Sequence, residues 1–404
     1  MSAYISFRSI RSSATQWKGF STSTRLQKLG LVPKMSVVAN PELQDLLTRF
    51  RENAVLPKHL TKYQQDLVYK KKHQSKLESE NVTANIGEEE FILKHIDIKK
   101  DIPRLKLLIS DVLGLIKNKE DWAVIPNVLH GLKNTGFKIK LPIAEKIVRK
   151  AGLAGKQNVT LECLRRTNNT GIDLSDAGLT KNVMFWIYFK ASQQDETLES
   201  INKTISMAEQ LLDMLEDEKF TGKRYLDTSK DYRNLPEILG MMVAIVALRA
   251  SKFQEGVDRD GKVKKYCTEF VIKSAATLPP STINGVEEAQ NLVNPKTPTE
   301  TNTTSSDTED VINSNKKQKT LNQRISQWMS WMMHNTQITK GIKLALPILD
   351  VNFEHTTLLR ERLASLEAEI SKVESVWKEV HVVQGKQPKD FDVSTLVLAN
   401  EPTE

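Results

Sequence analysis

Residues 134–137 read Asn-Thr-Gly-Phe, and residues 169–172 read Asn-Thr-Gly-Ile, so the same signal returns after 35 positions. Each run follows one helical pattern and precedes another. Glycine readily adopts the left-handed conformation that ends many helices, and the apolar residue after it can pack back on the helix. One period before Gly136 lies Asp101, just ahead of the preceding helical pattern. The sequence therefore predicts helical hairpins that repeat about every 35 residues.

Three pairs of helical patterns fill this period. The expected helices cover residues 103–116, 120–132, 142–151, 158–166, 179–191 and 196 onward. Apolar residues recur one period apart at Ile109, Ala144 and Leu179, at Leu113, Val148 and Val183, and at Val128, Cys163 and Leu198. Units of this size cannot bury an apolar face alone, so they stack into a solenoid. We expect an all-α fold of stacked hairpins, followed by a C-terminal region of long helices.

A 35-residue helical hairpin that ends in glycine and an apolar residue resembles the repeat of pentatricopeptide repeat proteins. The resemblance covers roughly residues 101–216, about a quarter of the chain. It implies that the first helices line a concave surface that binds single-stranded RNA, at about one base per repeat. It also implies that Glu145 and Ser175 select a base, and Thr180 another. Glu145 differs from the small polar residue usual there, and an acid facing RNA repels phosphate.

Basic residues of the first helices and adjoining turns can contact RNA phosphates. Those expected to bind RNA are Arg104, Lys106, Lys140, Lys146, Arg149, Lys150 and Lys181. Each phosphate contact makes binding weaken as salt rises. The alternative is a solvated helix face, the commoner role of charged residues on a helix.

Residues 1–34 are rich in Ser, Thr and Arg and contain no acid. This composition is typical of a mitochondrial transit peptide, because a basic amphipathic segment is drawn inward by the membrane potential. Residues 18–23 resemble a matrix-processing site, which predicts cleavage between Phe20 and Ser21. Most of the net charge of +8 lies before Glu42, so charge alone is weak support for nucleic-acid binding. We expect a location in the mitochondrial matrix; the alternative is a basic tail without a role in import.

Composition divides the rest of the chain. The expected order is the transit peptide (1–34), a helical N-terminal region (42–100), the helical-repeat domain (101–276), a disordered linker (277–319), amphipathic and heptad helices (320–380) and a flexible tail (381–404). The linker is rich in Pro, Ser, Thr and Asn, and it holds too little apolar surface to offset the entropy of ordering. Apolar residues from Leu359 to Val380 alternate at spacings of four and three, as in a coiled coil or a long bundle helix.

Trp328, Trp331 and Met332 share one face of the helical pattern after the linker. This face is expected to join the core, or else to contact a partner protein or the inner membrane. The second possibility supports an alternative function, a protein-binding adaptor or assembly factor in the matrix, with its protein partner bound through residues 320–380. No apolar stretch is long enough for an integral membrane span.

Sequence motifs of enzymes are absent, including phosphate-binding loops, dinucleotide-binding glycine patterns and hydrolase or kinase signatures. Two cysteines cannot form a thiolate zinc site, and the seven histidines lack metal-ligand spacing. No catalytic residue, metal or cofactor is therefore expected, and an enzymatic function ranks third, after an RNA-binding protein and a protein-binding adaptor. The sequence favours a protein that binds mitochondrial RNA or the mitochondrial ribosome and supports mitochondrial gene expression, through RNA processing, RNA stability or translation.

Overall fold

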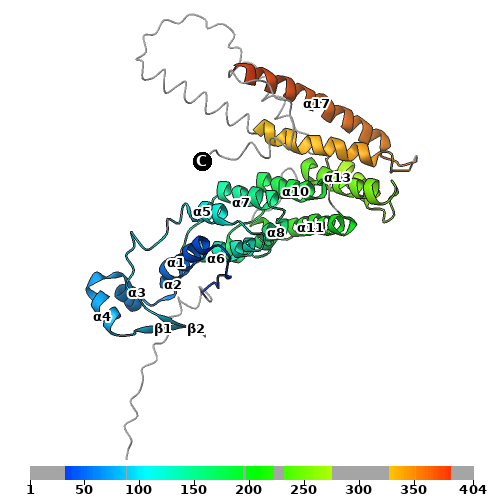
Figure 1. Ribbon diagram of the computed structural model, residues 1–404. Coiled ribbons are helices and arrows are strands. Elements are labelled where there is room, and N and C mark those ends of the chain that lie inside the picture. Colours follow the sequence, from blue (N-terminus) through cyan, green and yellow to red (C-terminus); the bar gives the residue numbers. More distant parts are fainter. Residues whose placement is uncertain are drawn as a thin grey trace, which may run out of the picture.

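The structure, a computed structural model, describes residues 32–87, 89–193, 197–222, 232–274, 327–350 and 352–383. Nearly all of the predicted transit peptide, with its cleavage site between Phe20 and Ser21, lies outside the described residues. So do the predicted linker and almost all of the predicted tail. Helices dominate the described chain, which confirms the prediction of an all-α fold (Figure 1).

The chain enters the fold through one long helical segment. It consists of α1 (Pro41–Arg49), the π-helical turn η2 (Phe50–Val55) and α2 (Leu56–His59). Asn40 starts the segment, because its side chain accepts a hydrogen bond from the backbone N–H of Glu42 at 3.0 Å. Leu43, Leu47 and Phe50 are fully buried. The segment thereby packs against the first hairpin of the helical stack.

A small lobe follows, with an apolar core of its own. It contains α3 (Lys62–Tyr69), the 3-10 helix η3 (Lys71–His73), α4 (Gln74–Ser79), β1 (Thr83–Ile86) and β2 (Glu89–Ile92). The antiparallel hairpin β1–β2 lies inside the region that the sequence predicts to be helical. Its strands are four residues long, too short for a clear alternation of apolar and polar residues. Gly87, with a φ of 64°, makes the turn.

The main body consists of two layers of helices (Figure 1). Successive neighbours in the first layer are α5 (Leu108–Leu115), α7 (Leu141–Leu153), α10 (Ala177–Ala191) and α13 (Pro236–Phe253). The second layer holds α6 (Ile125–Asn134), α8 (Gln157–Arg165) and α11 (Leu198–Glu216), and α14 (Lys262–Ser274) packs on α13. Short turns join them: η4 (Asp121–Val124), α9 (Thr167–Thr170), α12 (Glu218–Thr221) and η6 (Tyr232–Asn234).

Two glycines end successive hairpins as expected. Gly136 and Gly171 have φ angles of 85° and 74°, both left-handed. The apolar residue after Gly171, Ile172, is buried in the core. The period fails in the second helix of the third unit. Leu198 is the first residue of α11 and is 44% exposed, whereas Val128 and Cys163 lie within α6 and α8 and are buried. Whether these units are pentatricopeptide repeats stays a prediction.

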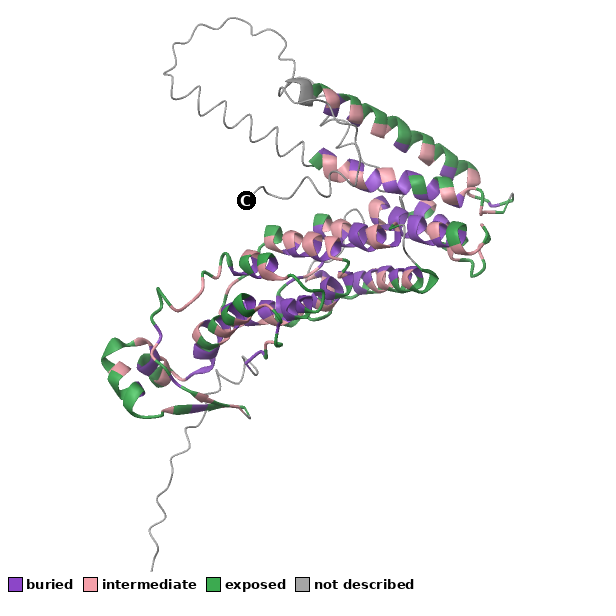
Figure 2. Cartoon of the chain, in the orientation of Figure 1, coloured by how far each residue is buried: buried purple, intermediate pink, exposed green. Residues whose placement is uncertain are grey.

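The C-terminal part of the described chain is an antiparallel pair of helices. A helix of residues 327–345 is followed by α17 (Thr356–Val383), and Lys343 pairs with Glu367 at 2.6 Å. Leu359, Leu366 and Val373, from the predicted stripe of α17, are buried. Helix 327–345 lies between α13 and α17 (Figure 1). Figure 2 shows exposed residues along the outer side of α17.

Candidate nucleic-acid interface

The predicted RNA-binding residues lie on the first layer of helices, and their surroundings differ along it. At one end, α5 packs beside α7, and Lys146 donates a hydrogen bond to the hydroxyl of Ser110 at 2.9 Å. At the other end, α10 packs beside α13, and Lys181 pairs with Glu237 at 2.7 Å. These two pairs of helices are called here the α5–α7 end and the α10–α13 end.

The α5–α7 end presents free cationic side chains. Arg104, Lys106 and Lys140 are exposed, and within the described ranges their side chains form no ion pair or hydrogen bond. Arg149 and Lys150 are half-buried on α7 and interact with neighbouring groups. A polyanion could therefore approach this end without first breaking an internal contact of Arg104, Lys106 or Lys140.

Three further lysines add positive charge before α5 and α7: Lys138, whose position the sequence already marked as available for RNA contact, and Lys99 and Lys100, which it did not. Lys99, Lys100 and Lys138 are exposed and have no ionic partner in the part of the chain that the structure describes. Residues 97–166 hold 15 Lys and Arg against 7 Asp and Glu, whereas residues 167–222 hold 4 against 10. This contrast is readable from sequence, but which lysines lack a partner is not.

The residues that the resemblance assigns to base selection are poorly placed for it. Thr180 is fully buried, and its hydroxyl donates to the carbonyl of Asp176 at 2.9 Å. The prediction that Thr180 contacts RNA is therefore wrong. Glu145 is half-buried, and burial, with the nearby Asp176 carboxylate, raises its pKa. Ser175 is half-buried in the loop before α10, where its backbone N–H donates to Asp173 at 3.0 Å.

Lys181 is engaged inside the protein rather than free for RNA. The side chains of Lys181 and Glu237 are 27% and 12% exposed. Burial alone would raise the pKa of Glu237, but the ion pair with Lys181 more than offsets it and lowers that pKa. The imidazole of His334 lies near both groups, and burial lowers its pKa, so the ring is neutral at pH 7. The prediction that Lys181 binds RNA conflicts with this ion pair.

Helix 327–345 covers the α10–α13 end. The Tyr188 hydroxyl of α10 donates to the side-chain carbonyl of Gln337 at 3.0 Å. The rings of Phe185 and His334 meet edge to face at 5.5 Å between centroids. Against α13 the approach is so close that a Cβ on Gly341 would lie 2.5 Å from the Cα of Ala244. The helix is thus packed into the first layer over α10 and α13.

The Trp and Met residues of this helix have little surface left for a partner. Trp328 and Met332 are 3% and 0% exposed, and Trp331 is half-buried. The prediction that Trp328 and Met332 contact a partner or a membrane is wrong, and the alternative of a core face holds for both. Among the described helices, none combines the length and the apolarity that crossing a bilayer requires.

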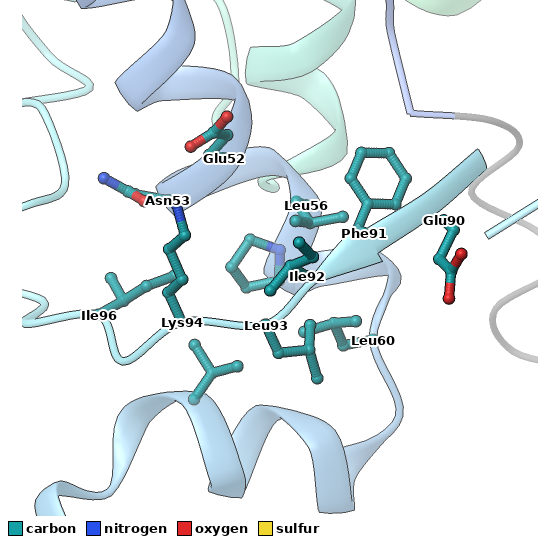
Figure 3. A pocket seen from close by; sticks show the side chains of 12 residues that line it. Glu52, Asn53, Leu56, Leu60, Glu90, Phe91, Ile92, Leu93, Lys94 and Ile96 are labelled. Carbon is teal, nitrogen blue, oxygen red and sulfur yellow. The ribbon is translucent and has the colours of Figure 1, made fainter. Parts of the chain in front are cut away.

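A hollow of about 290 Å³ lies in the N-terminal lobe, away from these residues (Figure 3). Figure 3 shows Glu52 and Asn53 on the π-helical turn, Lys94 extending toward Asn53, and Phe91 and Ile92 on β2. Most of the remaining lining residues are aliphatic. The hollow resembles a gap between two packed elements more than a site that gathers reactive groups.

The described residues also lack a metal centre, since nowhere do three or more His, Cys, Asp or Glu side chains gather as ligands. Cys163 and Cys267 are free and buried, and burial raises the pKa of each thiol to about 12. Both cysteines therefore act as small apolar core residues.

Comparison with known proteins identifies the family. The family described as Mrp13, mitochondrial ribosomal protein mS27, matches residues 18–392, which include both helical layers and the C-terminal helices. The chain belongs to the mitochondrial ribosomal protein mS27 family. The small ribosomal subunit protein mS27 of Neurospora crassa is 26% identical over 244 residues, 59% of this chain and 62% of that relative. The chain thus matches about three fifths of the length of this curated relative.

Membership of the mS27 family bears on several predictions. Its proteins are ribosomal components rather than enzymes, which confirms the expectation that the chain is not an enzyme. Family membership also confirms the prediction that the protein is mitochondrial, and it supports a matrix location and a connection with mitochondrial translation. Association with the inner membrane and the pentatricopeptide identity stay predictions.

Proposed function

We propose that this protein is a structural component of the mitochondrial small ribosomal subunit, where the α5–α7 end contacts ribosomal RNA and so supports translation. The observation that carries the proposal is the family match over residues 18–392. The free cations of the α5–α7 end agree with it, because phosphate contacts dominate the affinity of proteins for nucleic acids. The rival role of a free protein adaptor predicts no ribosomal association.

Sedimentation of a mitochondrial lysate through a sucrose gradient tests the first part of this proposal. The protein should travel with the ribosomal RNA of the small subunit, and it should move to lighter fractions after ribonuclease digestion. Sedimentation as a free protein, in a lysate whose other subunit proteins remain assembled, would contradict the proposal.

Charge reversal tests the second part. Exchange of Lys140, Arg149 and Lys150 for Glu should reduce association with the subunit, because three phosphate contacts become repulsive. A control with Lys264→Glu and Lys340→Glu changes two exposed lysines that have no ionic partner among the described residues. Circular dichroism should show that both variants fold. Unchanged association of the first variant would remove the α5–α7 end from the proposal.

A further inference from the structure

We propose that the RNA bound at the α5–α7 end is double-helical RNA held by its phosphates, and that helix 327–345 excludes a single strand from the α10–α13 end of the first layer. This inference rests on the proposed function and names the class of RNA. It differs from what the resemblance to pentatricopeptide repeats implies, which is a single strand read base by base along all the first helices.

Helix 327–345 already occupies the face of α10 and α13 along which a single strand would have to run. A strand that passed from α7 over α10 to α13 would have to enter the space where Gln337 bonds Tyr188 and His334 packs on Phe185. The close approach of Gly341 to Ala244 leaves no gap for a nucleotide between helix 327–345 and α13. Only the α5–α7 end of the layer remains free of this cover, so the accessible stretch is too short for a series of bases read by successive repeats.

The second step concerns base stacking. Proteins that bind single-stranded nucleic acid stack the bases on exposed aromatic side chains. Among aromatic side chains that the structure describes, only Tyr63 is classed as exposed, at 65%, and it lies on α3 in the N-terminal lobe. The aromatic residues of α10 instead form a core cluster, in which Phe185 contacts both Trp186 and Phe189. Phe137, beside Lys138, is half-buried against the core, so the described α5–α7 end offers bases no exposed aromatic platform.

The third step is what this end does offer. Lys138 and Lys140 lie just before α7, and Arg104 and Lys106 lie just before α5. The helices α5 and α7 pack side by side. Flexible cations contact phosphate groups and carry no sequence information directly. A duplex of RNA holds its phosphates in a regular A-form array, and such helices are recognised mainly by shape and by backbone contacts. Cations without an aromatic platform therefore fit a duplex better than a single strand.

Fluorescence anisotropy with the full chain tests the inference. The probes are a labelled RNA duplex of about 16 base pairs, a length that suits shape-based recognition, and one of its strands alone, chosen to lack self-structure. The duplex should bind roughly tenfold or more tightly at equal salt, and its affinity should fall as salt rises. A duplex of another sequence should bind equally well. A single strand that binds as tightly as the duplex, or more tightly, would overturn the inference.

Matched variants locate the contact. Lys138→Glu with Lys140→Glu should weaken duplex binding roughly tenfold, since two phosphate contacts turn repulsive. Lys264→Glu with Lys340→Glu should leave it within twofold, and circular dichroism should show that both proteins fold. Equal binding by all three proteins would overturn the assignment to this end. Failure of both RNAs to bind any of them would overturn RNA contact itself, whereas preference for the single strand would overturn only the class of RNA.

Discussion

The α5–α7 end and the α10–α13 end are built from the same kind of helical hairpin, yet one faces outward and the other is covered. Ile109, Ala144 and Leu179 occupy equivalent positions one period apart, and all three are buried. Lys140 before α7 is exposed, whereas Lys181 within α10 is held by Glu237. Position in a repeat thus fixes which residues are buried, and contacts with neighbouring elements, such as that of Lys181 with α13, fix which cations remain available to a partner.

The sequence of α10 explains why one end needs a cover. Residues 183–188 are buried without interruption, so this helix is apolar on every side. A helix that is hydrophobic all round must be enclosed by other elements. Helix α7, by contrast, keeps a polar side with Glu145 and Lys146 half-buried. Helix 327–345 therefore covers the side of α10 that the two layers leave open.

The largest expected effect on stability comes from shortening a buried side chain at the α10–α13 end. Phe185→Ala should lower the free energy of unfolding by about 3–5 kcal/mol, because the ring is fully buried and contacts the rings of Phe189 and His334. Leu107→Ala at the open end, where the side chain is 47% exposed, should change it by about 0.5 kcal/mol or less. Urea denaturation followed by circular dichroism measures both. Equal costs would remove the contrast between the two ends.

A larger side chain at the contact between helix 327–345 and α13 should force the two helices apart. Gly341→Val should cost about 1–3 kcal/mol, since its Cβ would lie 2.5 Å from the Cα of Ala244, a backbone atom that cannot yield easily. Gly114→Ala in α5, where nothing lies within 4 Å of an added Cβ, should stabilise the protein by about 0.5–1 kcal/mol. Thermal unfolding compares the two. An unchanged melting temperature for Gly341→Val would show that this close contact is not made.

The two lysines offer a finer comparison. Lys181→Ala should destabilise the protein by about 2 kcal/mol, because it leaves the largely buried Glu237 without its ionic partner. Lys140→Ala should leave stability within about 0.5 kcal/mol while weakening RNA binding. Chemical denaturation and RNA anisotropy, measured on both variants, separate the roles. The reverse pattern would contradict the distinction between a structural and an RNA-binding lysine.

The smallest expected effect is a dependence of stability on pH. Burial lowers the pKa of His334 below its usual 6.5, so the unfolded chain takes up a proton more readily than the folded one. Stability from this group is complete above pH 6.5 and falls as the pH decreases below it. Glu237 titrates below this range because its pKa is lowered. Burial also lowers the pKa of His130, so His130 contributes a loss of stability at low pH with the same sign as His334. His334→Asn should therefore show a shallower loss between pH 7.5 and pH 5.5, and an identical slope would contradict the assignment.

Much of the fold was predictable because it depends on short-range patterns. Helical spacing located the helices, and Gly136 and Gly171 marked the ends of hairpins through a requirement of the backbone itself. The hairpin β1–β2 was missed because four-residue strands carry too little pattern. Thr180 was misassigned because the resemblance gave its place in a repeat, and burial at that place depends on tertiary packing. The contact between Tyr188 and Gln337 joins residues 149 positions apart, which local periodicity cannot indicate.

The central claim is that the α5–α7 end is open to RNA while helix 327–345 covers the α10–α13 end. The most direct test is ultraviolet crosslinking in intact mitochondria, followed by isolation of the small subunit and identification of the RNA-linked peptides by mass spectrometry. Crosslinked peptides should fall within residues 99–150. Crosslinks from residues 177–191, 236–253 or 327–345, with none from residues 99–150, would contradict the account.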